Sequence, residues 1–135
     1  MKRISDKINQ ITEFLGHLED IVPSSFSEYK PNIEKKAACE RYVEKIVEAA
    51  TDLAFLIIKN KKLKIPDEDI DSFNILQENK IIDNNLAANL RRAKGMRNII
   101  AHEYGKIDDE IIFNAIKDQL ISDINKFLNK IKKIN

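Results

Sequence analysis

The chain contains few of the residues that form turns, cross-links or membrane spans. Its 135 residues include three glycines, three prolines, one cysteine and no tryptophan. Because turn-forming residues are scarce, we expect long helices joined by few loops. The single cysteine, Cys39, excludes an internal disulfide bond, which suits the reducing cytoplasm. No apolar run reaches the roughly 20 residues of a membrane span, and the N-terminus lacks a signal peptide's apolar segment. We therefore expect a cytoplasmic protein.

A strong net charge is also absent. The chain carries 23 basic and 22 acidic residues, which gives a formal net charge of +1. Global electrostatics therefore gives no sign of nucleic-acid binding, and any surface for an anionic partner must be local. Hydrophobic residues make up 43% and charged residues 33%, the balance of a soluble globular protein. This length favours one domain that spans residues 1–135.

Motifs for metal ions and phosphate loops are lacking as well. His17 and His102 are far apart in the chain, and one cysteine cannot complete a zinc site with them. The acidic stretch DEDID, residues 67–71, lacks the glycine and the terminal glutamate of a calcium loop. The glycines are isolated, so none forms a phosphate-binding loop. We expect neither a metal ion nor a cofactor.

Apolar residues recur every three or four positions along most of the chain, which is the spacing of amphipathic helices. This periodicity predicts helices over residues 3–21, 33–59 and 85–104, a short helix that ends near Asn79, and a last helix that starts at Asp108. The segment PSSFSEYKPN between the first two helices is predicted to be a loop. The sequence therefore predicts an all-α bundle of about five helices.

Polar residues stand where these helices are expected to begin. Asn32 can cap the second helix, Asp67 or Asp69 the short helix, and Asp83 or Asn84 the fourth, whereas Gly105 can close the fourth helix. Cys39 falls on the apolar face of the second helix, so we expect an inert, buried thiol.

The stretch MRNIIAHEYG, residues 96–105, departs from this regular pattern. On an ideal helix Arg97 and Tyr104 fall on the apolar stripe, whereas His102 lies about 140° from Arg97, in a sector with Asn98 and Arg91. One helix therefore does not put Arg97 and His102 on the same face. Either the helix ends near His102, or a second subunit brings another copy of the motif. The simplest structural alternative is a helix end with a capping basic residue and a packed tyrosine.

The stretch GMRNIIAHEYGKID resembles the signature of the HEPN superfamily, an arginine followed after four to six residues by a histidine, with a polar residue, here Asn98, after the arginine. The longer form, Arg97, His102 and Tyr104, is similar to the HepT branch, the toxin of a toxin–antitoxin pair. CERYVEKIVEAATDLAFLII and NILQENKIIDNNLAANLRRAKGMRN resemble other helices of that branch, so the resemblance covers roughly residues 34–131. It implies a HEPN-type bundle, a homodimer, metal-independent RNA cleavage at the dimer cleft, and a minimal nucleotidyltransferase as antitoxin.

Side-chain chemistry is consistent with these roles. RNA carries its own nucleophile, the 2′-hydroxyl, so cleavage needs a base, an acid and a cation near the phosphate. The Arg97 guanidinium matches phosphate oxygens, and a histidine such as His102 gains and loses a proton near neutral pH. Asn98 can orient the phosphate or His102 through its side-chain amide. The motif helix also carries further cations that would add a local positive field: Arg91, Arg92 and Lys94.

Two alternatives remain open at this point. The resemblance implies that Tyr104 accepts AMP groups from the nucleotidyltransferase, but simple packing of its ring at a helix end is equally consistent with the sequence. The whole chain could also be a non-catalytic module of the same fold. Such a module would bind a nucleotide, or dock the nucleotidyltransferase, without cleaving RNA.

Overall fold

The computed structural model of this chain describes residues 2–64, 71–102 and 107–134. Within these ranges the chain is helical and contains no strand, so the predicted all-α class is confirmed. The described elements, in chain order, are α1 (Lys2–Ile21), α2 (Phe26–Tyr29), α3 (Ile33–Asn60), α4 (Asp71–Glu78), α5 (Asn84–His102), α6 (Asp109–Ala115), the π-helical segment η1 (Ile116–Leu120) and α7 (Ile121–Ile134).

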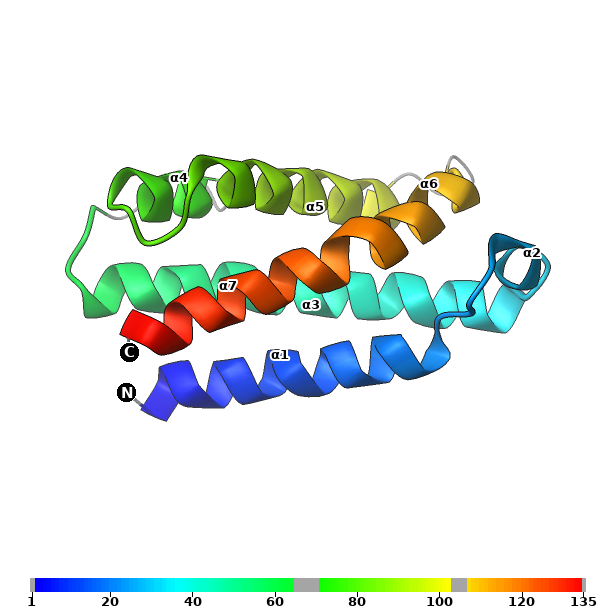
Figure 1. The fold of residues 1–135 in the computed structure, drawn as a ribbon, viewed down its shortest axis with the longest axis horizontal. Coiled ribbons are helices and arrows are strands. Elements are labelled where there is room, and N and C mark those ends of the chain that lie inside the picture. Colours follow the sequence, from blue (N-terminus) through cyan, green and yellow to red (C-terminus); the bar gives the residue numbers. More distant parts are fainter. Residues whose placement is uncertain (1, 65–70, 103–106, 135) are drawn as a thin grey trace.

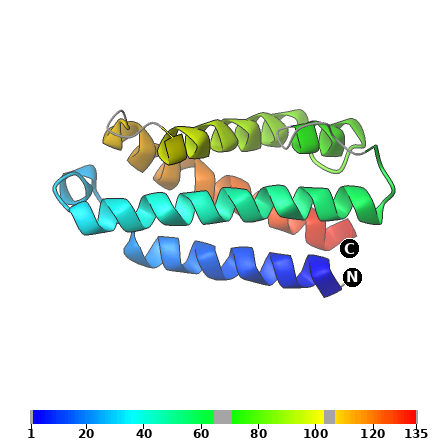
Figure 2. The ribbon, with the colours of Figure 1, turned by 180° about the vertical axis from the view of Figure 1, so that it is seen from behind.

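Helix α3 is the central element of the bundle (Figure 1). It contacts α1 on one side and α4 and α5 on the other, and α7 lies across the bundle against α1 and α5. Seen from behind, α3 lies in front of α7 (Figure 2). The sequence of α3 accounts for this position, because its apolar face is too wide for a single neighbour. Its buried residues are Cys39, Val43, Ile46, Val47, Ala49, Ala50, Thr51, Leu53, Ala54, Ile57 and Ile58.

Side-chain caps begin three helices where the sequence predicted them. Asn32 accepts a hydrogen bond from the Lys35 backbone N–H at 3.0 Å, and Asp83 accepts one from the Leu86 N–H at 2.8 Å. The Asp108 carboxylate accepts from the N–H groups of Glu110 and Ile111 at 3.0 and 3.2 Å. Each cap satisfies backbone donors that have no partner inside the helix. The other predicted terminal residues, Asp67, Asp69 and Gly105, lie outside the described residues.

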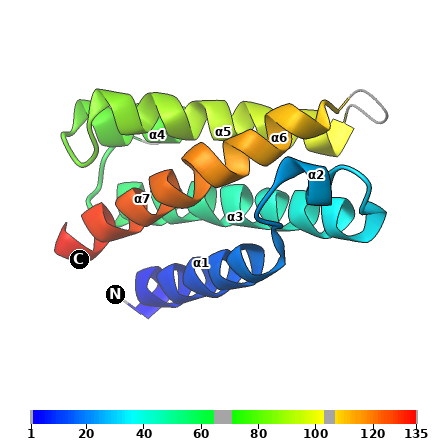
Figure 3. The ribbon, with the colours of Figure 1, turned by 45° about the vertical axis from the view of Figure 1, so that its right-hand side comes forward.

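The segment predicted to be a loop between the first two long helices contains the one-turn helix α2. The packing of the aromatic side chains of α2 explains why this segment is helical. The ring centroids of Phe26 and Tyr29 lie 5.9 and 5.1 Å from that of Phe113 on α6. The backbone of α2 accordingly lies beside α6 (Figure 3). Packing against a distant aromatic side chain therefore stabilises a turn that local sequence does not favour. A second difference is the π-helical turn η1, which interrupts the predicted last helix while Ile116 and Leu120 remain buried.

The core contains the predicted apolar stripes, and Cys39 is fully buried within it. Burial raises the pKa of the Cys39 thiol to about 11, so it is protonated near neutral pH and is a poor nucleophile. The expectation that this thiol is buried is confirmed. In the described part of the chain, no helix is both long and apolar enough to cross a membrane.

Candidate active site

The motif helix α5 packs against α3, α4 and α7 and leaves the remaining face in solvent. Asn98, Ile99 and His102 are exposed, whereas Arg97 is directed towards α3 and its side chain is only 24% exposed. Arg97 and His102 thus lie on different faces of α5, as the helical wheel predicted. A single protomer does not place both groups on one face, although both belong to the last two turns of the described helix.

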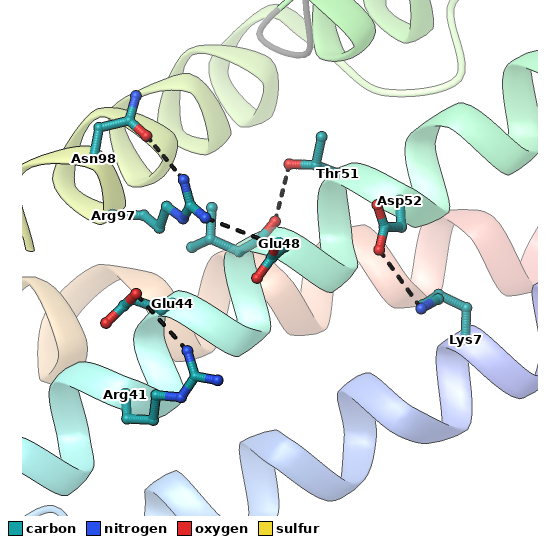
Figure 4. A network of polar contacts seen from close by, with 9 residues as sticks. Lys7, Arg41, Glu44, Glu48, Thr51, Asp52, Arg97 and Asn98 are labelled. Atoms are coloured by element: carbon teal, nitrogen blue, oxygen red, sulfur yellow. Dashed lines mark hydrogen bonds and ion pairs between the residues drawn. The ribbon is translucent and has the colours of Figure 1, made fainter. Parts of the chain in front are cut away.

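The Arg97 guanidinium lies at the junction of α5 with α3 (Figure 4). Its Nη2 is 3.7 Å from Oε1 of Glu48 on α3, and its Nη1 donates a hydrogen bond to Oδ1 of Asn98 at 3.3 Å. The Nε atom is buried and has no hydrogen-bond partner among the described residues. An arginine in this setting keeps its charge and has donors that can bind the oxygens of a phosphate.

His102 is the last described residue of α5, and its imidazole is exposed. An imidazole can in general accept or donate a proton, and it can also bind a phosphate oxygen. Exposure also leaves its ring accessible to a large substrate or to a second protein chain.

The other predicted cations of α5 are not gathered around Arg97. Arg91 donates a hydrogen bond to the side chain of Asn74 on α4, and exposed Arg92 donates one to Asn89 of its own helix. Lys94 is half-buried. These contacts direct Arg91 and Arg92 to neighbours other than α3. The local positive field that the sequence predicted from these three cations stays a prediction.

Arg92 also lines a pocket of about 40 Å³ between α5 and the η1–α7 segment. In this pocket Asn89 donates a hydrogen bond to the buried carboxylate of Asp123 on α7 at 3.2 Å. A volume of this size has room for little more than water. The pocket therefore belongs to the packing between α5 and α7.

Comparison with known proteins identifies the family. The ribonuclease HepT-like family model matches residues 5–131. The chain belongs to this family. The match confirms the predicted HEPN, HepT-type resemblance and extends it to α1, which the sequence motifs had left outside.

Two curated relatives match along almost their entire length. The chain is 27% identical to the mRNA nuclease HepT of Shewanella oneidensis over 129 residues, which is 96% of each protein. It is also 27% identical to the tRNA nuclease HepT of Aphanizomenon flos-aquae over 138 aligned positions, with 98% of this chain and 94% of that protein covered. These relatives act on two different classes of RNA.

Two solved structures have the same fold. A tri-AMPylated HEPN toxin of Shewanella oneidensis in complex with MNT antitoxin superposes with a TM-score of 0.89, at 26% identity and 96% coverage of both chains. A toxin–antitoxin structure with AMP-PNP gives a TM-score of 0.91, at 25% identity and coverage of 98% of this chain and 99% of that chain. The HepT-like toxin fold thus extends along nearly the whole chain.

Tyr104, the third residue of the predicted motif, lies outside the described residues. In the described ranges, no group of three or more histidine, cysteine, aspartate or glutamate side chains is arranged to hold a metal ion.

Glu48 is the neighbour of Arg97 that sequence reasoning missed. It is an exposed acid within a stretch of α3 in which Val47, Ala49 and Ala50 are buried. That interruption is visible in the sequence. The sequence does not show which helix this acid faces, because the pairing depends on how α3 and α5 align in the bundle.

Proposed function

We propose that this protein is a metal-independent ribonuclease toxin of a type VII, HEPN/MNT toxin–antitoxin system. Membership of the ribonuclease HepT-like family supports the activity, and curated HepT relatives are named as nucleases of mRNA and tRNA. The observation that carries the assignment is the pair of side chains in the last two described turns of α5: the Arg97 guanidinium at the junction with α3, and the exposed imidazole of His102. The enzyme acts in the cytoplasm as a single HEPN domain formed by residues 1–135.

The proposed reaction uses the RNA's own 2′-hydroxyl. A base removes its proton, the 2′-oxygen attacks the adjacent phosphorus, and the bond from phosphorus to the 5′-oxygen breaks. The leaving 5′-oxygen receives a proton from the acid, so the first product carries a 2′,3′-cyclic phosphate. Arg97 binds the phosphate as its negative charge increases, and His102 transfers a proton. Asn98 holds the guanidinium through its side-chain oxygen.

A homodimer supplies the arrangement that one protomer lacks. Because Arg97 and His102 lie on different faces of α5, a two-fold axis beside this helix would bring each motif next to its copy. One histidine then acts as base and the other as acid. The side chain of Ile99, at 47% exposure between Asn98 and His102, is an apolar contact for such an interface. Sedimentation as a monomer at micromolar concentration would rule out this composite site.

The proposed antitoxin is a minimal nucleotidyltransferase that transfers AMP to Tyr104. The related Shewanella oneidensis toxin is described as tri-AMPylated and in complex with MNT antitoxin, which supports this partner. In this transfer the tyrosine oxygen loses its proton and attacks the α-phosphorus of ATP, which forms one phosphodiester and releases pyrophosphate. The added anion occupies space needed by the RNA phosphate or pairs with Arg97. Exposed Arg92, together with Arg91 and Lys94, adds positive charge for RNA binding.

The central experiment measures RNA cleavage by purified protein beside an Arg97→Ala variant, with and without EDTA. We expect cleavage by the wild-type chain in both conditions and none by the variant. Cleavage that stops in EDTA would refute the metal-independent mechanism. RNA binding without cleavage by the wild-type chain would favour the alternative, a non-catalytic module paired with the nucleotidyltransferase.

Modification is tested separately by coexpression with the proposed nucleotidyltransferase antitoxin. We expect adenylate mass on the peptide that contains Tyr104, and a Tyr104→Phe variant that remains toxic despite the partner. An unmodified Tyr104 in fully neutralised protein would mean that the antitoxin acts by binding alone.

A further inference from the structure

The arrangement around Arg97 includes a residue that lies far from the motif in the sequence. Glu48, on α3, places its carboxylate 3.7 Å from the Arg97 guanidinium on α5. We propose that Glu48 is a positioning residue for Arg97, which orients the guanidinium at the α3–α5 junction towards an RNA phosphate. This inference rests on the ribonuclease function proposed above and adds a residue to the same site.

Arg97 needs an oppositely charged neighbour at this position. Its side chain is three-quarters buried, and the buried Nε has no hydrogen-bond partner among the described residues. Burying a guanidinium without a compensating charge is unfavourable. Asn98 holds Nη1 but is neutral, whereas Glu48 supplies a negative charge beside Nη2. The orientation of the guanidinium plane is therefore determined from two sides, by an amide on α5 and a carboxylate on α3.

The length of the contact suits a positioning role. A separation of 3.7 Å is too long for a hydrogen bond, so the carboxylate attracts the guanidinium without using one of its N–H donors. The Glu48 side chain is also 58% exposed, so it is free to move when a phosphate arrives. Glu48 can thus orient Arg97 before the substrate binds and leave its donors for the substrate.

Neighbouring acids on α3 have different partners (Figure 4). Glu44, one turn before Glu48, lies 3.9 Å from Arg41 of the same helix. Asp52, one turn after Glu48, lies 3.7 Å from Lys7 on α1. Among these three acids spaced by four residues, Glu48 is the one paired with the motif arginine. Glu44 therefore provides a matched control for removing a charge from the same helix.

The test compares Glu48→Gln with Glu44→Gln in steady-state cleavage of a defined RNA oligonucleotide. Glutamine preserves the shape of the side chain and removes its charge. We expect Glu48→Gln to lower kcat about tenfold while KM changes less than about twofold, because a misoriented guanidinium weakens its contact with the transition state more than overall RNA affinity. Glu44→Gln should match the wild-type chain in both constants, and thermal melting should show all three proteins equally folded.

A second arm asks whether Glu48 acts through Arg97. An Arg97→Lys background lacks the planar guanidinium that Glu48 is proposed to orient. We therefore expect Glu48→Gln to change kcat less than about twofold in this background. A tenfold loss in that background, or an altered pH profile in the single variant, would overturn the positioning role, since Glu48 would then act on the RNA itself. Wild-type kcat in Glu48→Gln would also overturn it, as would a several-fold lower KM at unchanged kcat, which would make Glu48 a competitor of phosphate.

The two proposals fail in distinguishable ways. If Arg97→Ala cleaves RNA like the wild-type chain, the assignment of Arg97 as a catalytic residue is wrong, and the proposed role of Glu48 is refuted as well. If Arg97→Ala is inactive while Glu48→Gln is fully active, the ribonuclease assignment stands and the inference about Glu48 alone is refuted.

Discussion

The two halves of α5 differ in the contacts that their side chains make with the rest of the bundle. The first half is anchored by buried side chains, and its arginines donate to neutral amides: Leu86, Ala87 and Leu90 are buried, and Arg91 and Arg92 contact Asn74 and Asn89. In the second half Ile100 is buried, Asn98, Ile99 and His102 are exposed, and Arg97 faces the carboxylate of Glu48. One helix thus combines a structural anchor with an accessible end that carries the proposed chemistry. Cations on the same helix need not share a role, because their neighbours determine what each can do.

The largest expected effect comes from removing either proposed catalytic side chain of the second half. We expect Arg97→Ala and His102→Ala each to lower RNA cleavage by about 10²–10³-fold or more, because each removes a group proposed to act on the reacting phosphate or its protons. Toxicity in cells should fall in parallel. Circular dichroism should show unchanged helicity, since neither side chain belongs to the apolar core. Full activity of His102→Ala would exclude it as the proton-transfer group.

A substitution in the anchored first half should lower the stability of the protein and leave the cleavage rate of folded molecules unchanged. Leu90 is 1% exposed, so Leu90→Ala leaves a cavity and should lower the free energy of unfolding by about 2–5 kcal/mol. Urea denaturation measures this loss. The fraction that remains folded should cleave RNA at the wild-type rate when activity is normalised to folded protein. A loss of cleavage per folded molecule would mean that the two halves are not separable.

A smaller effect is expected from Arg92, the exposed arginine of the first half. Arg92→Gln removes one cation from the surface proposed to attract RNA. We expect RNA affinity to fall a few-fold, with the slope of log affinity against log salt reduced by about 1. Fluorescence anisotropy across a salt series measures both. An unchanged slope would show that Arg92 serves only the packing of α5 against α7.

The smallest effect concerns Gly95, between the two halves. A Cβ placed at Gly95 meets no atom within 4 Å, so the protomer has room for alanine. Gly95→Ala should raise the free energy of unfolding of the protomer by about 0.5–1 kcal/mol, because alanine favours the helix. If this face of α5 meets its two-fold copy, the added methyl should weaken dimerisation. Analytical ultracentrifugation of the variant beside the wild-type chain distinguishes the two outcomes.

Local signals in the sequence predicted most of the secondary structure. The long helices follow from apolar spacing, and the caps at Asn32, Asp83 and Asp108 follow from polar residues placed before that spacing begins. The helix α2 was missed because its stability depends on Phe113, far along the chain. The π-helical turn η1 was missed because the apolar spacing continues through it.

The candidate site also combines residues that the sequence indicates with contacts that the sequence does not reveal. Arg97, Asn98 and His102 were found from the sequence because they lie within one motif on one helix, and 3.6-residue periodicity already separated Arg97 from His102. The amino-acid sequence by itself thus determined the long helices and their caps, which depend on interactions between near neighbours, and it indicated the proposed reactive groups. Only the tertiary structure decided that Glu48 faces Arg97 and that Arg91 is held by Asn74, because contacts between helices depend on how their buried faces pack together.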